Sequence, residues 1–256
     1  MTPEALLRDA EPFDHTGGEH GVLVLHGFTG SPQSVKPLAK WFAEAGFSVS
    51  APLLPGHGTT VEDMLATGWT DWSNAAERAY LDLASRCSRI VVAGLSMGGT
   101  LTTWLALRHP EIAGIVTINP LIDARAPLWS GLVAAGRHSD AATLPALGSD
   151  IAMPGVVESA YDAVPVAGLE SVTAAVLELA SDPRPLDMPA LIFVSLHDHV
   201  VDPASAHALA ARCTGTTIVR ELGASYHVAT LDYEAEEIAS ESLAFARACT
   251  SEQYPR

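Results

Sequence analysis

The fold of this chain is decided by the stretch Ile90-Val91-Val92-Ala93-Gly94-Leu95-Ser96-Met97-Gly98. Residues 90–93 are apolar and mostly β-branched, which predicts a buried strand, and residues 99–107 predict a helix directly after the stretch. Between them lies Gly-X-Ser-X-Gly, a pattern in which a serine sits on a sharp strand-to-helix turn with its hydroxyl exposed. Glycines two before and two after the serine let strand and helix approach closely. A Gly-rich connection without chemistry is the alternative, but the flanking elements favour Ser96 as a nucleophile.

Strands and helices alternate on both sides of this stretch. Strands are predicted at 21–25, 47–51, 89–93, 112–118, 190–195 and 217–222, and helices at 31–45, 71–86, 97–108, 203–212 and 233–249. This alternation is typical of a mostly parallel sheet with helices on both faces, here of six or seven strands. Residues at about 123–185 interrupt it and are too many for a simple loop. We therefore expect one α/β domain, residues 1–256, with a helical cap inserted at about 123–185.

The composition excludes several classes of function. The formal net charge is −16, and no basic run occurs, which disfavours nucleic-acid partners and adhesion to anionic lipid. The three cysteines, Cys87, Cys213 and Cys249, are widely spaced, which argues against a disulfide framework or a structural zinc site. The N-terminus lacks the pattern of a signal peptide, and no apolar run approaches 18 residues. We expect a cytoplasmic protein.

A serine nucleophile needs a base, and the base needs an acid that orients it. In a parallel sheet, such residues lie just beyond the carboxyl ends of strands. Asp198 follows the strand predicted at 190–195, and His227 follows the strand predicted at 217–222. The chain order Ser96, Asp198, His227 is the order of nucleophile, acid and base that accompanies this serine pattern.

Other residues compete for these roles. Asp123 follows the preceding strand, Asp202 precedes Pro203 as a helix N-cap would, and Asp232 lies close to His227 in sequence. Asp198 is favoured because it lies nearest the expected strand end. Among the ten histidines, His26 and His57 lie in Gly-rich turns, where they are expected to bond loop backbone. The run His197-Asp198-His199 has no third ligand nearby, so no metal site is expected.

Acyl transfer also needs backbone N–H groups aimed at the negative charge that develops on the substrate oxygen. One donor is expected to be the amide of Met97, directly after the nucleophile and at a helix N-terminus. The other is expected in the first strand-to-helix loop, residues 26–30, with Phe28 as donor. A tight turn alone would also explain the glycines of this loop, and the two interpretations are compatible. The side chains of Phe28 and Met97 are further candidates for the wall of an apolar acyl pocket.

With these pieces assembled, the chain resembles the bacterial monoacylglycerol lipases and carboxylesterases of the α/β-hydrolase fold, in particular the thermostable Bacillus type. The resembling stretches are residues 21–30, 56–59, 71–72, 94–102, 148–161, 190–195, 198–201 and 225–233. The resemblance implies the same triad and the same two oxyanion donors. It also implies that Glu158, in the cap, contacts the hydroxyl groups of glycerol; an exposed position on the outer face of the cap is the alternative. Residues 124–147 depart from the family's pattern, so the resemblance implies no acyl-chain length.

The sequence thus predicts a carboxylic ester hydrolase that cleaves monoacylglycerols to glycerol and fatty acid through an acyl-enzyme, without metal or cofactor. A generalist short-chain carboxylesterase or thioesterase is the alternative enzyme, because its triad would be identical. A non-catalytic small-molecule binding protein is the alternative on the same fold. Such proteins typically lack a triad member, whereas all three are present here. The apolar cap is compatible with transient contact with a lipid surface.

Overall fold

The computed structural model describes residues 5–125, 127–139, 141–146 and 148–251. The strands are β1 (Phe13–His15), β2 (His20–Leu25), β3 (Ser48–Ala51), β4 (Arg89–Leu95), β5 (Gly114–Ile118), β6 (Thr143–Pro145), β7 (Ala163–Pro165), β8 (Ala190–Ser195) and β9 (Thr217–Leu222). The α-helices are α1 (Lys36–Glu44), α2 (Val61–Leu65), α3 (Trp69–Ala84), α4 (Met97–Arg108), α5 (Pro127–Arg137), α6 (Val166–Ser181), α7 (Ala204–Arg212) and α8 (Ala235–Thr250). Two short 3₁₀ helices are η1 (Pro32–Ser34) and η2 (Ala229–Leu231).

Seven strands form one sheet in the order β1-β3-β2-β4-β5-β8-β9. Every neighbouring pair is parallel except β1 and β3, which confirms the predicted, mostly parallel sheet. β4 lies at the centre, between β2 and β5. Leu25 pairs with Gly94, and Leu95 pairs with Ile118, so the carboxyl ends of these three strands lie side by side. The loops that follow them therefore meet at one edge of the sheet.

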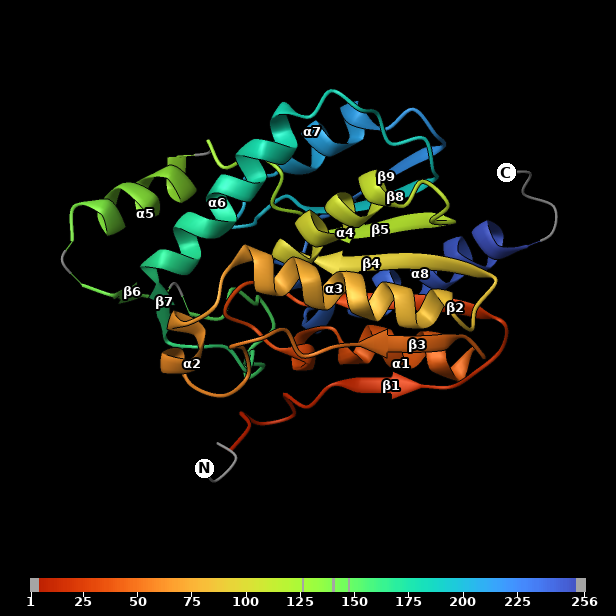
Figure 1. The fold of residues 1–256 in the computed structure, drawn as a ribbon, viewed down its shortest axis with the longest axis horizontal. Helices are drawn as coiled ribbons and strands as arrows, with labels where there is room; N and C mark the ends of the chain where they lie inside the picture. The colour runs from red at the N-terminus through yellow and green to blue at the C-terminus, as the bar shows by residue number, and fades with distance from the viewer. Residues whose placement is uncertain (1–4, 126, 140, 147, 252–256) are drawn as a thin grey trace.

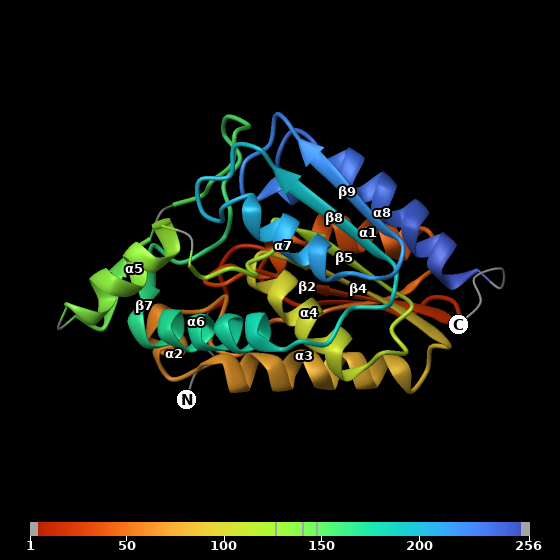
Figure 2. The ribbon, with the colours of Figure 1, turned by 90° about the horizontal axis from the view of Figure 1, so that it is seen from above.

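Helices cover both faces of the sheet. α1 and α8 lie on one face, and α3, α4, α6 and α7 lie on the other (Figures 1 and 2). Each face buries its own apolar cluster, one including Phe42 and Phe193 and the other including Trp72 and Leu101. Burial on both faces explains why β4 and β5 are apolar almost throughout.

Two predicted helices begin elsewhere. The helix expected at 31–45 is split into η1 and α1, because Pro37 has no N–H and would clash with the fourth carbonyl before it in a continuous helix. The helix expected to start at Asp71 starts at Trp69 instead. There the Asp71 carboxylate accepts the amide N–H of Gly68 at 3.0 Å, which satisfies a donor at the helix start.

The chain leaves the main sheet between β5 and β8, in the interval expected to hold a cap. The interval contains the helices α5 and α6, as expected of a helical cap, and also the antiparallel strand pair β6–β7, which was not expected from the sequence. The central residues of both strands, Leu144 and Val164, precede prolines, and a residue before proline favours extended backbone. α5 lies beyond the end of the sheet, whereas α6 packs against α3 and α4 (Figures 1 and 2).

Candidate active site

Ser96 lies on the tight turn between β4 and α4. Its backbone has φ 57° and ψ −116°, a costly conformation that persists only where the surroundings hold it. Its N–H donates to the carbonyl oxygen of Ile118 at 3.0 Å. Its own carbonyl oxygen accepts the amides of Gly99 at 2.8 Å and Leu121 at 3.2 Å. These bonds fix the strained turn, and the hydroxyl stands at the N-terminus of α4.

Two glycines make this turn possible. A Cβ atom on Gly94 would lie 2.1 Å from the carbonyl oxygen of Gly98. A Cβ atom on Gly98 would lie 2.1 Å from the carbonyl oxygen of Leu25. Both distances are far below van der Waals contact with backbone atoms that cannot move aside. The expectation that these positions must lack bulk is confirmed.

The structure brings the predicted acid and base together. Nδ1 of His227 lies 2.7 Å from Oδ2 of Asp198, and both side chains are buried. The other oxygen, Oδ1, accepts the amides of Val200 and Val201 at 2.8 Å each. A carboxylate can only accept, so Nδ1 of His227 carries the proton and Nε2 is left as an acceptor. That is the tautomer a general base requires.

The alternative acids are engaged elsewhere. Asp123 forms a two-bond ion pair with Arg125, at 2.8 and 3.1 Å. Asp202 accepts the amide of Ala204 in the first turn of α7. Asp232 accepts backbone amides, among them those of residues 152, 153 and 226. Within the described chain, the imidazole of His227 bonds to none of the three.

Ser96 and His227 line one cavity of about 90 Å³. Its apolar wall is made by Phe28, Leu95, Trp129, Leu132, Val164, Leu169, Val200 and Val228. Two carboxylates, Asp150 and Glu158, also face it. The cavity therefore joins a nucleophile, a base, an apolar surface and two polar acceptors.

The two expected oxyanion donors flank Ser96. Met97 is the first residue of α4, where backbone N–H groups have no partner within the helix. Loop 26–30 lies against the nucleophile, because a Cβ atom on Gly27 would be 3.9 Å from Ser96 Oγ. The side chains of the two donors differ. Phe28 lines the cavity, whereas the Met97 side chain is fully buried in the core and does not form part of the acyl pocket wall.

Glu158 belongs to segment 148–161, which is hydrogen-bonded to the loops that follow β2 and β9, on either side of Ser96. After β2, the amide of Tyr161 donates to the carbonyl oxygen of Thr29 at 3.1 Å. After β9, the amide of Val228 donates to the carbonyl oxygen of Asp150 at 3.0 Å. These bonds place Glu158 beside the oxyanion loop, and a Cβ atom on Gly30 would lie 2.8 Å from its Oε1.

Three carboxylates raise the pKa of His227. Burial opposes the charged imidazolium, but the carboxylates of Asp198, Glu158 and Asp150 outweigh it, and the pKa of His227 is raised. Burial also raises the pKa of the Glu158 carboxyl, against the opposing effects of His227 and a hydrogen bond with Ser34.

Two further histidines belong to this region: His26 begins loop 26–30, and His57 packs against His26 and Phe28. Nδ1–H of His26 donates to Gly27 O at 2.9 Å, while its Nε2 accepts the amide of Leu54 at 3.1 Å. Nδ1–H of His57 donates to Pro55 O at 3.0 Å. Burial lowers the pKa of His26 to about 4 and that of His57 to about 3, so both are neutral. Both bond loop backbone, which is the role expected for them.

Asp150 was not singled out from the sequence. Its Oδ2 accepts the amides of His199 at 3.0 Å and His227 at 3.1 Å, and its Oδ1 bonds Nδ1 of His199 at 2.9 Å. No local pattern marks this aspartate, because its partners lie 49 and 77 residues away.

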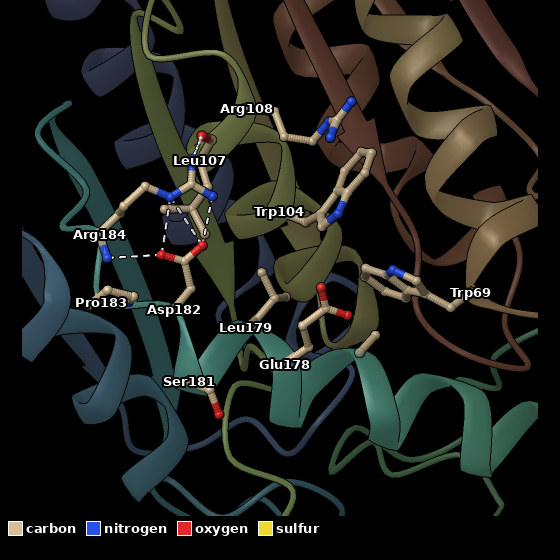
Figure 3. A pocket seen from close by; sticks show the side chains of 11 residues that line it. Trp69, Trp104, Leu107, Arg108, Glu178, Leu179, Ser181, Asp182, Pro183 and Arg184 are labelled. Carbon is tan, nitrogen blue, oxygen red and sulfur yellow. Dashed lines mark hydrogen bonds and ion pairs between the residues drawn. The ribbon is translucent and has the colours of Figure 1, made fainter.

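A larger hollow, about 640 Å³, lies on the α3–α4–α6 face (Figure 3). The rings of Trp69 and Trp104 contact each other there edge to face, with their centroids 6.4 Å apart. Cζ of Arg108 lies 4.6 Å from the centroid of the Trp104 ring. The residues that line it include none of the predicted site residues. The smaller cavity is therefore the candidate active site, because it alone of these two holds the nucleophile and base.

The parallel sheet, the serine on its strained turn and the acid–base pair at the neighbouring strand ends define an α/β-hydrolase of the serine class. The chain belongs to the family described as serine aminopeptidase, S33, whose model matches residues 19–153.

Two curated relatives agree with this class. The chain is 45% identical over 245 residues to the thermostable monoacylglycerol lipase of Bacillus sp. (strain H-257), covering 94% of this chain and 95% of the relative. It is 27% identical over 231 residues to a carboxylesterase of Bacillus subtilis (strain 168), covering 88% and 91%.

A solved structure agrees as well. A structure from LipS and LipT, two metagenome-derived lipolytic enzymes, is 41% identical with a TM-score of 0.90, covering 95% of this chain and 100% of that one. The protein is accordingly a carboxylic ester hydrolase. No helix in the described part of the chain is long and apolar enough to cross a membrane.

Proposed function

We propose that the protein hydrolyses monoacylglycerols to glycerol and fatty acid, with Ser96, Asp198 and His227 as its triad. The observation that carries the proposal is Glu158, a carboxylate in the same cavity as Ser96 and His227. An apolar wall suits an acyl chain, and a carboxylate beside the reacting centre suits a hydroxylated alcohol. The similarity to a monoacylglycerol lipase supports the same substrate.

In the proposed mechanism, Ser96 Oγ attacks the ester carbonyl while Nε2 of His227 takes the hydroxyl proton. The amides of Met97 and Phe28 donate to the oxyanion of the tetrahedral intermediate. The carbon–oxygen bond to glycerol then breaks, and His227 returns the proton to the departing alkoxide. Water then attacks the acyl-enzyme while His227 takes its proton; the bond between the acyl carbon and Ser96 Oγ breaks, His227 returns the proton to Oγ, and the fatty acid leaves. Asp198 holds the tautomer of His227 and stabilises the imidazolium.

The test compares 1-monoacylglycerols, diacylglycerols and methyl esters of matched acyl chains. We expect a higher kcat/KM for the monoacylglycerol than for the methyl ester of the same acid. Equal values for short methyl esters would instead indicate a generalist carboxylesterase, the activity named for the Bacillus subtilis relative. If the protein hydrolysed none of these esters, the result would support a binding protein on this fold.

Glu158→Ala is expected to raise KM for monoacylglycerol by about 10- to 150-fold, because a charge-assisted hydrogen bond to a hydroxyl contributes about 1.5–3 kcal/mol. KM for a p-nitrophenyl ester of the same acid should change by less than about twofold, since that ester has no glycerol. Steady-state kinetics at pH 8.5 on both substrates measure the difference. An equal loss on both esters would contradict glycerol recognition by Glu158.

The acid limb of the pH profile is expected above pH 6.5. His227 must be neutral to act as a base, and its pKa is raised, so activity is lost at a higher pH than an ordinary histidine would give. Glu158→Gln removes one of the carboxylates that favour the imidazolium, and the limb should move to lower pH. The measurement is kcat/KM for a p-nitrophenyl ester between pH 5 and 9. A limb that stays in place or rises would refute this electrostatic role.

The proposal extends to domain organisation and location. We propose a single domain, residues 1–256, in which 123–185 form the insertion above the site. Exposed apolar side chains on the insertion, at Val157 and Leu177, support transient contact with a lipid surface. The three cysteines are free thiols, which supports a cytoplasmic location.

A further inference from the structure

A buried asparagine follows β5, one residue after the carbonyl that binds the Ser96 amide. Asn119 is 2% exposed, and its backbone has φ 45°, in the left-handed region. Asparagine tolerates this region better than most residues, yet the conformation still costs free energy. The contacts of the Asn119 side chain must therefore offset the cost of this backbone conformation.

The Asn119 amide connects β8 with the loop that carries the base. Its Oδ1 accepts the amide of Ser195 at 2.7 Å, and its Nδ2 donates to Ser195 Oγ at 2.9 Å. Nδ2 also donates to the carbonyl oxygen of His227 at 2.8 Å, with a longer contact of 3.3 Å to that of Tyr226. Ser195 Oγ in turn donates to the Tyr226 carbonyl oxygen at 2.8 Å. Two polar side chains thus hold two consecutive carbonyls, at the base and just before it.

His227 is consequently fixed at three points by three separate parts of the chain. Asp150 accepts its N–H at 3.1 Å, Asp198 bonds its Nδ1 at 2.7 Å, and Asn119 donates to its carbonyl oxygen at 2.8 Å. The first two partners are carboxylates that also raise the pKa of the imidazole. Asn119 is neutral and, in the described chain, is not among the residues that line the cavity. It can act on the reaction through the position of His227.

We propose that Asn119, supported by Ser195, is a positioning residue that sets the place of the His227 backbone, and thereby of Nε2, relative to Ser96. This proposal rests on the proposed function, because it assumes that His227 is the base. No apolar residue can replace Asn119 at its place without leaving buried carbonyl and amide groups unpaired. A displacement of a catalytic group by about 1 Å can cost about 100-fold in rate.

The test is a mutant cycle measured on an activated p-nitrophenyl ester. The variants are Asn119→Ala, His227→Ala and the double variant, with wild type and Ser96→Ala measured first. Asn119→Ala should lower kcat by about 10- to 100-fold and change KM by less than about twofold. In the His227→Ala background, the added Asn119→Ala substitution should change the residual kcat by less than about twofold, because the imidazole that Asn119 positions is absent.

Thr117→Val is the matched control. Thr117 lies on β5, two residues before Asn119, and is fully buried. Its Oγ1 makes no hydrogen bond with any described residue, so kcat should stay at the wild-type value. Thermal unfolding of every variant identifies those that fail to fold. If Asn119→Ala is one, Ser195→Ala replaces it in the cycle, with an expected loss in kcat of about 3- to 10-fold.

Two results would overturn the proposal: a wild-type kcat for the folded variant, or a further loss of more than about fivefold in the His227→Ala background. The second would show a general structural effect on the site. Turnover by wild type that survives Ser96→Ala would refute the proposed function itself, and it is recognised before the Asn119 variants are measured.

Discussion

Ser96→Ala is expected to lower kcat for monoacylglycerol by about 10⁴- to 10⁶-fold, because members of a catalytic triad act as a unit. The serine occupies a strained turn, which backbone hydrogen bonds to Ile118, Gly99 and Leu121 hold in place. Its removal deletes the atom that forms the acyl-enzyme, while the turn, the oxyanion donors and the cavity persist. Steady-state turnover and labelling by a fluorophosphonate, which should vanish together, measure the effect.

Ser242→Ala is the control for this substitution. Ser242 is fully buried in α8, and its Oγ has no hydrogen-bond partner among the described residues. Its kcat should equal that of wild type. A Ser96→Ala enzyme that retains more than about 1% of the wild-type kcat would rule out Ser96 as the nucleophile.

Asp198→Asn is expected to lower kcat by about 10³- to 10⁴-fold. Oδ1 of Asp198 accepts the amides of Val200 and Val201, and an asparagine will keep its oxygen there. Its NH₂ group then faces Nδ1 of His227, which must become an acceptor, so the proton moves to Nε2. An imidazole protonated at Nε2 cannot take the proton of Ser96. Steady-state kinetics at pH 8.5 measure the loss.

Asp123→Asn provides the matched comparison, because Asp123 follows the neighbouring strand and was the main alternative acid. Its carboxylate pairs with Arg125 on the surface, and that pair lowers its pKa. We expect a kcat within about twofold of wild type. If Asp123→Asn were the damaging variant and Asp198→Asn the neutral one, the assignment of the acid would be reversed.

Local patterns were sufficient for the parts of the site whose geometry depends on neighbours in sequence. The turn at Ser96 could be predicted because Gly94 and Gly98 must admit backbone atoms that lie within four residues or on the adjacent strand. The strand-and-helix alternation predicted the parallel sheet for the same reason, since the hydrophobic period of each segment is a local property. The order of Asp198 and His227 then followed from where strands end.

The predicted secondary structure was wrong where a proline restricts the backbone of nearby residues. The predicted site was incomplete where distant loops meet. Pro37 divides the first helix, and prolines after Leu144 and Val164 produce a strand pair in an insertion expected to be helical. The Met97 side chain faces the core although its amide lies at the site. These outcomes depend on backbone restrictions and on the direction of side chains. The pattern of apolar residues in the sequence indicates neither.

The sequence by itself determined the nucleophile turn, the mostly parallel sheet and the strand ends at which an acid and a base must lie, because each follows from periodicity or from the bulk of nearby residues. Tertiary structure decided which aspartate reaches the base, how Glu158 comes to lie in the cavity, and that Asn119 and Asp150 hold His227. Those contacts join residues 29 to 108 positions apart. They arise only when parallel strands align the loops at one edge of the sheet, and no local pattern encodes that alignment.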